Sequence, residues 1–407
     1  MAVLIFIAAF SAIMTGVVIV LYVNVNIRLS ADGIRLKQPS LRTKAGGSGA
    51  YVVERTAALA READALRQAL DDTVSASNAG LRRQRSPRTD SKRSDGPPQV
   101  TLSFVGDCTL GQSYNSASSR HFSAFYENEP KEYFFGGVRG VFASDDLTIV
   151  NLEGPLTESA AMRSKPEEGP KYWFRGAPEY AEILSAGSVE IANLANNHTR
   201  DFGDEGFRDT KAALKRAGVE YFGYDDILTR QIRGIKIGFF GLSASAGAGV
   251  IKARVNALKR EGAHVIIASF HGGLPIASYA PTPTQRSAAH TAIDNGAAFV
   301  VEHHPHVLQG IELYNGGVIA YSLGNFCFGG NINPTDKDTM IFQVVITQTA
   351  GKLHGTYRVI PASISSSDDR NDYRPRLLAG DDARSVLDKI ARLSGETDVV
   401  AAHAKYP

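Results

Sequence analysis

The chain has 407 residues, of which 43% are hydrophobic and 21% are charged, a composition typical of a folded protein with more than one small core. The formal net charge is +2, but residues 24–98 carry 14 basic and 8 acidic side chains, which leaves 30 basic and 34 acidic ones in 99–407. This acidic balance argues against nucleic-acid binding by the main part of the chain. Two cysteines, Cys108 and Cys327, exclude a disulfide scaffold and a thiolate metal site; they either bridge each other or remain free buried thiols.

The first segment, residues 1–24, is predicted to be a transmembrane anchor. Residues 2–23 carry no charged side chain, and 22 helical residues span about 33 Å, enough to cross a bilayer. A signal peptide fits less well, because no basic residue precedes the apolar run and no A-x-A cleavage site follows it. The basic residues that follow the span, taken alone, favour a cytoplasmic main domain.

Residues 25–98 are predicted to form a stalk helix, at about 51–83, and a basic flexible linker. Leu59, Ala63, Leu66 and Leu70 alternate in spacings of four and three, which favours a short coiled coil and therefore a homodimer. The alternative is an amphipathic stalk helix without a permanent partner.

The main domain, residues 99–365, has the pattern of a layered α/β fold. Helical segments at 205–218 and 284–296 alternate with apolar stretches that indicate strands. The expected strands are 100–107, 147–154, 190–198, 263–273, 297–306 and 317–326. Residues 366–407 are expected to be a C-terminal extension with one amphipathic helix, at 383–395.

Polar side chains recur where these strands end, and ligands bind at the carboxyl ends of strands in open α/β sheets. The residues concerned are Asp107, Asn151, Glu153, Asn196, Asn197, His198, His271, His304 and His306. Carboxylates, carboxamides and imidazoles suit divalent metals, and a carboxylate can bridge two ions. Because residues i and i+2 of a strand share a face, we expect His304 and His306 to face the cleft and His303 to point away.

The motifs SFVGDCTLG, NLEGPLT, LANNHTRDFG, SFHGG, HHPHVLQGIE and YSLGNF resemble the CapA/PgsA family of capsule and poly-γ-glutamate biosynthesis proteins, over about 99–365. The catalytic-type domain of that family is related to calcineurin-like metallophosphoesterases, which implies a β-sandwich flanked by helices. It also implies one or two divalent ions, among which Mn, Zn, Fe, Mg and Ca are not distinguished. The metal ligands implied are Asp107, Glu153, Asn197, His271, His304 and His306, with His198 as general acid and Asp201 to orient it.

Three departures from the superfamily pattern bear on the chemistry. Thr109 replaces the histidine of Asp-x-His, which favours one tightly held ion and a second weak one; Asn151 and Glu153 replace two aspartates; and Glu302 replaces a glycine. Asn151, Asn196 and Asn325 are candidate supporting residues. Lys171 and Arg175 precede a predicted helix, where they either face an anionic substrate or lie in a plain surface turn.

The resemblance implies a membrane-anchored protein of capsule or poly-γ-glutamate synthesis or export, a metal-dependent hydrolase or transferase acting on an anionic polypeptide. The implied partners are that polymer, the membrane and other subunits of a capsule synthase. The family places the main domain outside the cytoplasmic membrane, in the periplasm or the extracellular space, against the charge bias noted above. A metal-dependent phosphoesterase and a non-catalytic assembly subunit are the two alternatives.

Overall fold

The computed structural model describes residues 28–30, 33–35, 98–114, 120–165, 172–273 and 278–395. The chain divides into two compact units, Met1–Pro87 and Arg88–Pro407. In the first unit, β1 (Arg28–Ser30) pairs antiparallel with β2 (Gly33–Arg35). The expected anchor at 1–24, the expected stalk helix at 51–83 and Lys171 lie outside the described residues. No helix within the described ranges is both long and apolar enough to cross a bilayer.

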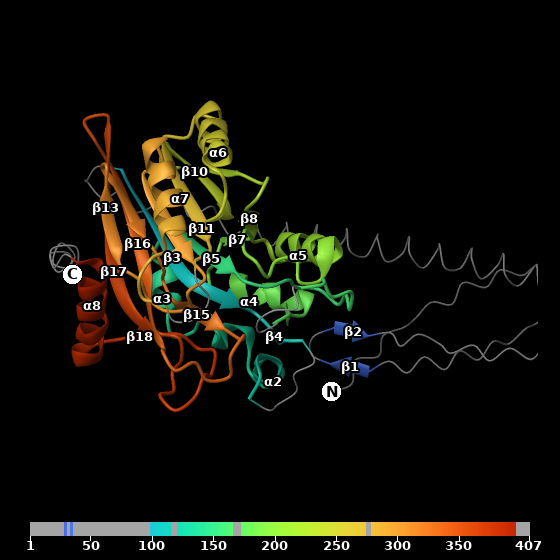
Figure 1. The fold of residues 1–407 in the computed structure, drawn as a ribbon. Helices are drawn as coiled ribbons and strands as arrows, with labels where there is room; N and C mark the ends of the chain where they lie inside the picture. The colour runs from blue at the N-terminus through green and yellow to red at the C-terminus, as the bar shows by residue number, and fades with distance from the viewer. Residues whose placement is uncertain are drawn as a thin grey trace, which may run out of the picture. The chain divides into compact units, whose positions relative to one another are not determined.

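Two β-sheets form the second unit (Figure 1). The eight-stranded sheet has the order β18-β17-β16-β3-β5-β7-β8, with β15 paired to β3 off this path. Its strands are β3 (Gln99–Thr109), β5 (Leu147–Leu152), β7 (Ile191–Asn193), β8 (Glu220–Phe222), β15 (Asn325–Phe328), β16 (Asp338–Thr349), β17 (Lys352–Ser363) and β18 (Arg376–Leu377). The six-stranded sheet has the order β13-β14-β12-β11-β10-β9. Its strands are β9 (Leu228–Ile232), β10 (Ile235–Ser243), β11 (Val265–His271), β12 (Phe299–His303), β13 (Ile311–Tyr314) and β14 (Gly317–Ala320).

The two sheets pack face to face and bury the main core between them. This core joins Phe104 and Phe342 of the eight-stranded sheet to Phe239, Ile267 and other apolar side chains of the six-stranded sheet. Full burial of one such side chain contributes about 1.5–3 kcal/mol. The parallel strands β3, β5 and β7 of one sheet and β10, β11 and β12 of the other therefore present their carboxyl ends in two opposed rows.

Helices cover the outer faces of the sandwich. In Figure 1, α6 and α7 lie against β10, β11 and β12, while the red helix α8 packs on β17 and β13. Shorter helices gather around a second apolar cluster on the eight-stranded sheet. The helices are α2 (Phe122–Asn128), α3 (Arg139–Phe142), α4 (Ala181–Ala186), α5 (Gly203–Ala217), α6 (Ala248–Arg260), α7 (Pro283–Asp294) and α8 (Gly380–Ser394), with 3-10 turns η1 (Lys131–Tyr133) and η2 (Pro178–Tyr180). The mixed α/β fold predicted from the sequence is confirmed.

Local sequence explains where the two long predicted helices begin and end. Helix α5 buries Phe207, Thr210 and Leu214 at helical spacing and is capped at its C-terminus by Gly218, whose φ of 74° is left-handed. Helix α7 begins at a capping box in which Thr282 and Gln285 satisfy each other's backbone N–H groups.

The sixth expected strand, 317–326, is wrong as a single element. It divides into β14 in the six-stranded sheet and β15 in the eight-stranded sheet, and the chain turns between them at Gly324, with a φ of 74°. Beside this turn, a Cβ atom on Gly106 would lie 2.1 Å from the Gly324 carbonyl oxygen. Glycine at position 106 thus allows β15 to approach β3 and places Asn325 opposite Asp107.

Both cysteines are free and buried. Cys108 lies on β3 and Cys327 on β15, where its thiol donates a 3.3 Å hydrogen bond to the Tyr373 carbonyl oxygen. Of the two alternatives left open by the sequence, a disulfide bridge or two free buried thiols, the structure has the free thiols.

Candidate metal centre

Most of the candidate residues meet at the carboxyl ends of parallel strands from both sheets. Asp107 lies near the end of β3 and Glu153 just after β5, while His271 ends β11 and the turn after β12 carries His304 and His306. Glu153, His304 and His306 each offer one ligand atom, and these three atoms lie within 4.8 Å of one another. The convergence expected from the strand-end pattern is therefore present in the fold.

Asp107 is the most heavily engaged carboxylate of this cluster. Its Oδ1 accepts a 2.8 Å hydrogen bond from Asn151 Nδ2 and lies 3.5 Å from His303 Nδ1. Its Oδ2 lies 3.1 Å from His306 Nδ1 and accepts a bond from the His304 backbone N–H. Burial by itself would raise the pKa of Asp107, but His306, His271 and His303 hold that pKa well below its ordinary value. Asp107 is therefore an anion at neutral pH.

Glu153 is different, because its buried carboxylate lacks hydrogen-bond partners. The residue has no exposed surface, and neither of its oxygens has a partner among the described residues. Imidazole nitrogens of His271, His306 and His198 surround it at 3.6, 3.8 and 3.9 Å. Burial raises the pKa of Glu153 to about 8, the charge of His306 opposes this shift, and that of Asp107 adds to it. An unsatisfied buried carboxylate is costly unless a cation completes it.

The two cluster histidines reach the site by a route that differs from the expected one. Strand β12 ends at His303, and His304 and His306 have positive φ values of 105° and 60°. A turn, and not strand alternation, therefore brings both side chains to the cluster. The expectation that His303 points away is wrong, because it is buried and its ring approaches Asp107. Strand register explains this, since His303 pairs with His271 and shares its face.

Neighbouring groups fix the orientation and charge of these imidazoles. His304 Nδ1 lies 3.1 Å from His271 Nε2. Asn325 forms two hydrogen bonds with His306. Its Oδ1 accepts from the His306 Nδ1 at 3.0 Å, and its Nδ2 donates to the His306 carbonyl oxygen at 3.2 Å. Burial and the charge of His306 lower the pKa of His304 to about 4. Burial would also lower the pKa of His306, but Glu153 and Asp107 raise it to about 9. The proton held by His306 thus occupies the space between two carboxylates where a metal ion would bind.

A second group of contacts surrounds His198 at the edge of the cluster. Its Nδ1 donates a 2.7 Å hydrogen bond to Asp201 Oδ2, as expected from the sequence, and its Nε2 faces Glu153. Asp201 also accepts from the Phe174 backbone N–H, and Lys165 Nζ lies 2.6 Å from its other oxygen. Burial lowers the pKa of His198 despite Asp201, so the imidazole is neutral with its Nε2 free to accept a proton.

Sequence reasoning missed Lys165 and Asn193. Lys165 stands in a loop without any motif, so the sequence carries no signal for it. Asn193 ends β7 and donates to Asn151 Oδ1 at 3.0 Å and to Ser269 Oγ at 3.1 Å. The strand-end rule that selected the other polar residues applies equally to Asn193.

The other asparagines predicted for the site divide into structural and exposed positions. Asn196 donates to the Leu152 carbonyl oxygen and accepts from the His198 backbone N–H, so it shapes the turn that carries His198. Asn197, the implied metal ligand of this pair, is exposed. Arg175, on β6 (Phe174–Arg175), lines a separate cavity, while its neighbour Phe174 packs on His198 with the rings tilted and their centroids 4.2 Å apart.

The donor set fits a divalent cation. The cluster combines carboxylate oxygens with imidazole nitrogens, the ligand types that borderline divalent metals prefer. Glu153 is the position best suited to one, because its oxygens have no hydrogen-bond partner in the described part of the chain and face the imidazoles of three histidines. Asp107, Glu153, His271, His304 and His306 are the residues that would hold the ion.

Comparisons with known proteins place the chain among capsule proteins. The family model described as "Bacterial capsule synthesis protein PGA_cap" matches residues 101–330. The chain is 28% identical to "Capsule biosynthesis protein CapA" of Bacillus anthracis over 272 residues, 60% of this chain and 63% of the relative. It is 26% identical to "PGA biosynthesis protein CapA" of Bacillus subtilis (strain 168) over 289 residues, 65% and 72% of the two chains. The match to the Bacillus anthracis protein thus spans somewhat less than two thirds of its length.

Two solved structures show weak overlap. A hypothetical protein from Thermus thermophilus aligns with 64% of this chain and 99% of its own, at 14% identity and a TM-score of 0.38. A conserved uncharacterized protein from Streptococcus pneumoniae aligns with 70% and 99% of the two chains, at 10% identity and a TM-score of 0.25. Because both TM-scores are this low, the family assignment rests on the sequence matches alone.

Proposed function

Because the chain belongs to the PGA_cap family of bacterial capsule synthesis proteins, we propose that it uses a divalent-metal site to act on an anionic capsule polypeptide of the poly-γ-glutamate type. The reaction class is hydrolysis or transfer at an amide or ester bond of that polymer. The polymer class rests on the names of the relatives, and the chemistry rests on the strand-end cluster.

The single observation that carries the proposal is the state of Glu153. A carboxylate that is fully buried, faces three imidazoles and has no hydrogen-bond partner in the described structure is a ligand position. When bound there, a divalent ion supplies Lewis acidity and lowers the pKa of coordinated water. Asp107 would add a second carboxylate to the site, and His306 would add a nitrogen ligand.

The other residues of the centre handle protons and orientation. Asp201 holds His198 in the tautomer that carries its proton on Nδ1, which leaves Nε2 to accept a proton from the nucleophile and return it to the leaving group. Lys165 neutralises Asp201, with its Nζ 2.6 Å from Asp201 Oδ1. The exposed Arg163 on the same loop is a basic side chain of the kind that attracts an anionic polymer.

The metal content of the full 407-residue chain, purified without a polyhistidine tag, tests this proposal. We expect stoichiometric divalent metal in the wild type and loss of that metal in a His304→Ala/His306→Ala double variant. His354→Ala is the matched control, because His354 is an exposed histidine on β17. Equal metal in the double variant and the wild type would refute the assignment.

A phosphoesterase is the second candidate, and the His198–Asp201 pair beside Glu153 is the observation that favours it. Metal-loaded protein should be assayed with γ-glutamyl oligomers and with an aryl phosphate, each against His198→Ala. Turnover of the phosphate alone, lost in that variant, supports the phosphoesterase. Retained capsule formation in cells that carry His198→Ala supports a non-catalytic assembly role instead.

We also propose that residues 1–24 anchor the protein in the cell membrane, with the main domain outside the cytoplasmic membrane. There it meets the polymer and other subunits of a capsule synthase, and residues 51–83 join two copies. A reporter fused after residue 98 tests the topology: an enzyme active only outside the cytoplasm should be active at that position. If a reporter that works only in the cytoplasm is active at that position, the main domain lies inside the cytoplasmic membrane and the proposed orientation is wrong.

A further inference from the structure

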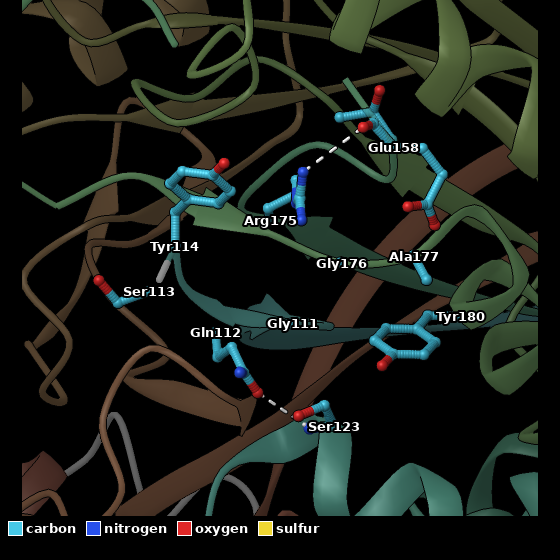
Figure 2. Close-up of a pocket in the computed structure, with 11 residues that line it drawn as sticks. Gly111, Gln112, Ser113, Tyr114, Ser123, Glu158, Arg175, Gly176, Ala177 and Tyr180 are labelled. Atoms are coloured by element: carbon cyan, nitrogen blue, oxygen red, sulfur yellow. Dashed lines mark hydrogen bonds between the residues drawn. The ribbon is translucent and has the colours of Figure 1, made fainter. Parts of the chain in front are cut away.

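A polar cavity of about 310 Å³ lies on the far side of the β4–β6 ribbon from His198. Strand β4 (Gln112–Ser113) pairs antiparallel with β6. Because successive residues of a strand face opposite sides, Phe174 packs on His198 and Arg175 lines the cavity. The lining residues are Gly111, Gln112, Ser113, Tyr114, Ser123, Thr157, Glu158, Arg175, Gly176, Ala177 and Tyr180 (Figure 2).

Arg175 is held in place by contacts with rings and a carbonyl oxygen, none of which, among the described residues, carries a negative charge. Its guanidinium carbon lies 4.6 Å from the ring centre of Tyr114 and 5.5 Å from that of Phe202. Its Nη1 donates to the Ser159 carbonyl oxygen at 3.0 Å. Among the described residues it forms no salt bridge, so Nη2 and Nε are oriented donors for a carboxylate of a ligand.

The same cavity also offers a negative group. Glu158 is exposed at the cavity, and Figure 2 shows it on the same side as Arg175, with Gln112, Ser123 and Tyr180 across the space. A ligand bound here therefore meets a guanidinium and a carboxylate together, with amide and hydroxyl groups opposite. A simple anion would be repelled by Glu158, whereas a molecule with adjacent carboxylate and ammonium groups complements both charges.

We propose that this cavity binds a free α-amino-carboxylate head group, with the carboxylate at Arg175 and the ammonium at Glu158. This inference rests on the proposed function, because in a γ-linked glutamate chain only the amino-terminal unit has both groups free. Interior units carry an uncharged amide nitrogen beside each α-carboxylate, and Glu158 repels them. The cavity thus selects the amino end of the polymer.

The position of the cavity connects this end to the metal centre. The segment that begins with Glu153 reaches Glu158 after five residues, which span at most about 18 Å when extended. The same segment is tied to the ribbon, since the Thr157 backbone N–H donates to the Gly176 carbonyl oxygen at 2.9 Å. Because the cavity and His198 lie on opposite faces of the ribbon, a polymer whose amino end lies in the cavity has to pass around the edge of the ribbon to reach His198.

Calorimetric binding of short γ-glutamyl oligomers to the full chain tests the inference. We expect an oligomer with a free amino end to bind at least tenfold more tightly than its N-acetylated form. Glu158→Gln should abolish this preference, and Arg175→Gln should weaken both ligands. Arg175→Lys, which keeps the positive charge but loses the planar guanidinium with its paired N–H donors, should also weaken the binding of both oligomers. Thermal unfolding of each variant checks that it is folded.

Equal affinity for the free and acetylated oligomers, or a preference that survives Glu158→Gln in folded protein, would overturn the inference. The metal content of the same samples separates this result from the proposed function. Metal and polymer binding without an end preference would refute only the cavity assignment. An end preference in a protein that never takes up metal would refute the metal-dependent function and leave the cavity assignment standing.

Discussion

Replacing Glu153 by glutamine should make the metal-free protein more stable than the metal-free wild type, and the protein with metal less stable than the wild type with metal. Without metal, the wild type buries a carboxylate whose oxygens have no hydrogen-bond partner in the described structure, at a cost of about 1–3 kcal/mol. At a pH above about 8, the value to which burial raises the pKa of Glu153, glutamine removes a buried charge, while His306 keeps Asp107 as its nearer anionic neighbour, at 3.1 Å against 3.8 Å for Glu153. With metal at 100 times its dissociation constant, the wild type should gain about 2.7 kcal/mol, which the variant should largely lose.

Urea unfolding of the wild type and of Glu153→Gln, each with a chelator and with added metal, measures the four free energies of unfolding. Glu302→Gln is the matched control, because Glu302 is also fully buried, with a raised pKa and no hydrogen-bond partner for its oxygens, but among the described residues it forms no ion pair with an imidazole. That variant should keep the full gain from metal. If Glu153→Gln is less stable than the wild type in chelator, or gains as much from metal, the view of Glu153 as an unsatisfied ligand is incorrect.

Three further changes test the parts around the centre. Asp201→Asn should lower the turnover number about 100-fold or more at unchanged metal content, because the tautomer of His198 is no longer fixed; steady-state kinetics and metal analysis measure both. Asn325→Ala should weaken metal affinity about 10- to 100-fold by releasing His306, which titration with a competing chelator detects. Phe342→Ala, in the core between the sheets, should cost about 3–5 kcal/mol of unfolding free energy, read from the urea midpoint, without changing metal stoichiometry in the folded protein.

The strand-end positions could be predicted because each follows an apolar run that can only be a buried strand. Asp107, Glu153 and His271 stand directly at such ends, and the fold brings them together. The dyad of His198 and Asp201 was also predictable, since both lie in one short turn, three residues apart.

The rest depends on tertiary structure that periodicity does not encode. The positive φ of His304 and His306 is imposed by the turn after β12, so alternation along a strand gave the wrong side for His303. The long β16–β17 hairpin was missed because polar residues such as Gln343 and Thr347 interrupt its apolar pattern. The cavity at Arg175 is formed by residues from 111–123, 157–158 and 175–180, which the β4–β6 pairing and the bridge between Leu156 and Gly176 bring together.

The metal centre belongs to neither sheet alone. Asp107 and Glu153 come from the eight-stranded sheet, whereas His271, His304 and His306 come from the six-stranded one. The carboxylates and imidazoles meet only when the two sheets pack on each other, so the apolar core between them sets the ligand distances. A cation bound by both rows therefore links the two sheets at their carboxyl ends, where Glu153 otherwise opposes folding. The same packing that stabilises the sandwich thus encloses the unpartnered carboxylate of Glu153, on which the proposed affinity for a metal depends.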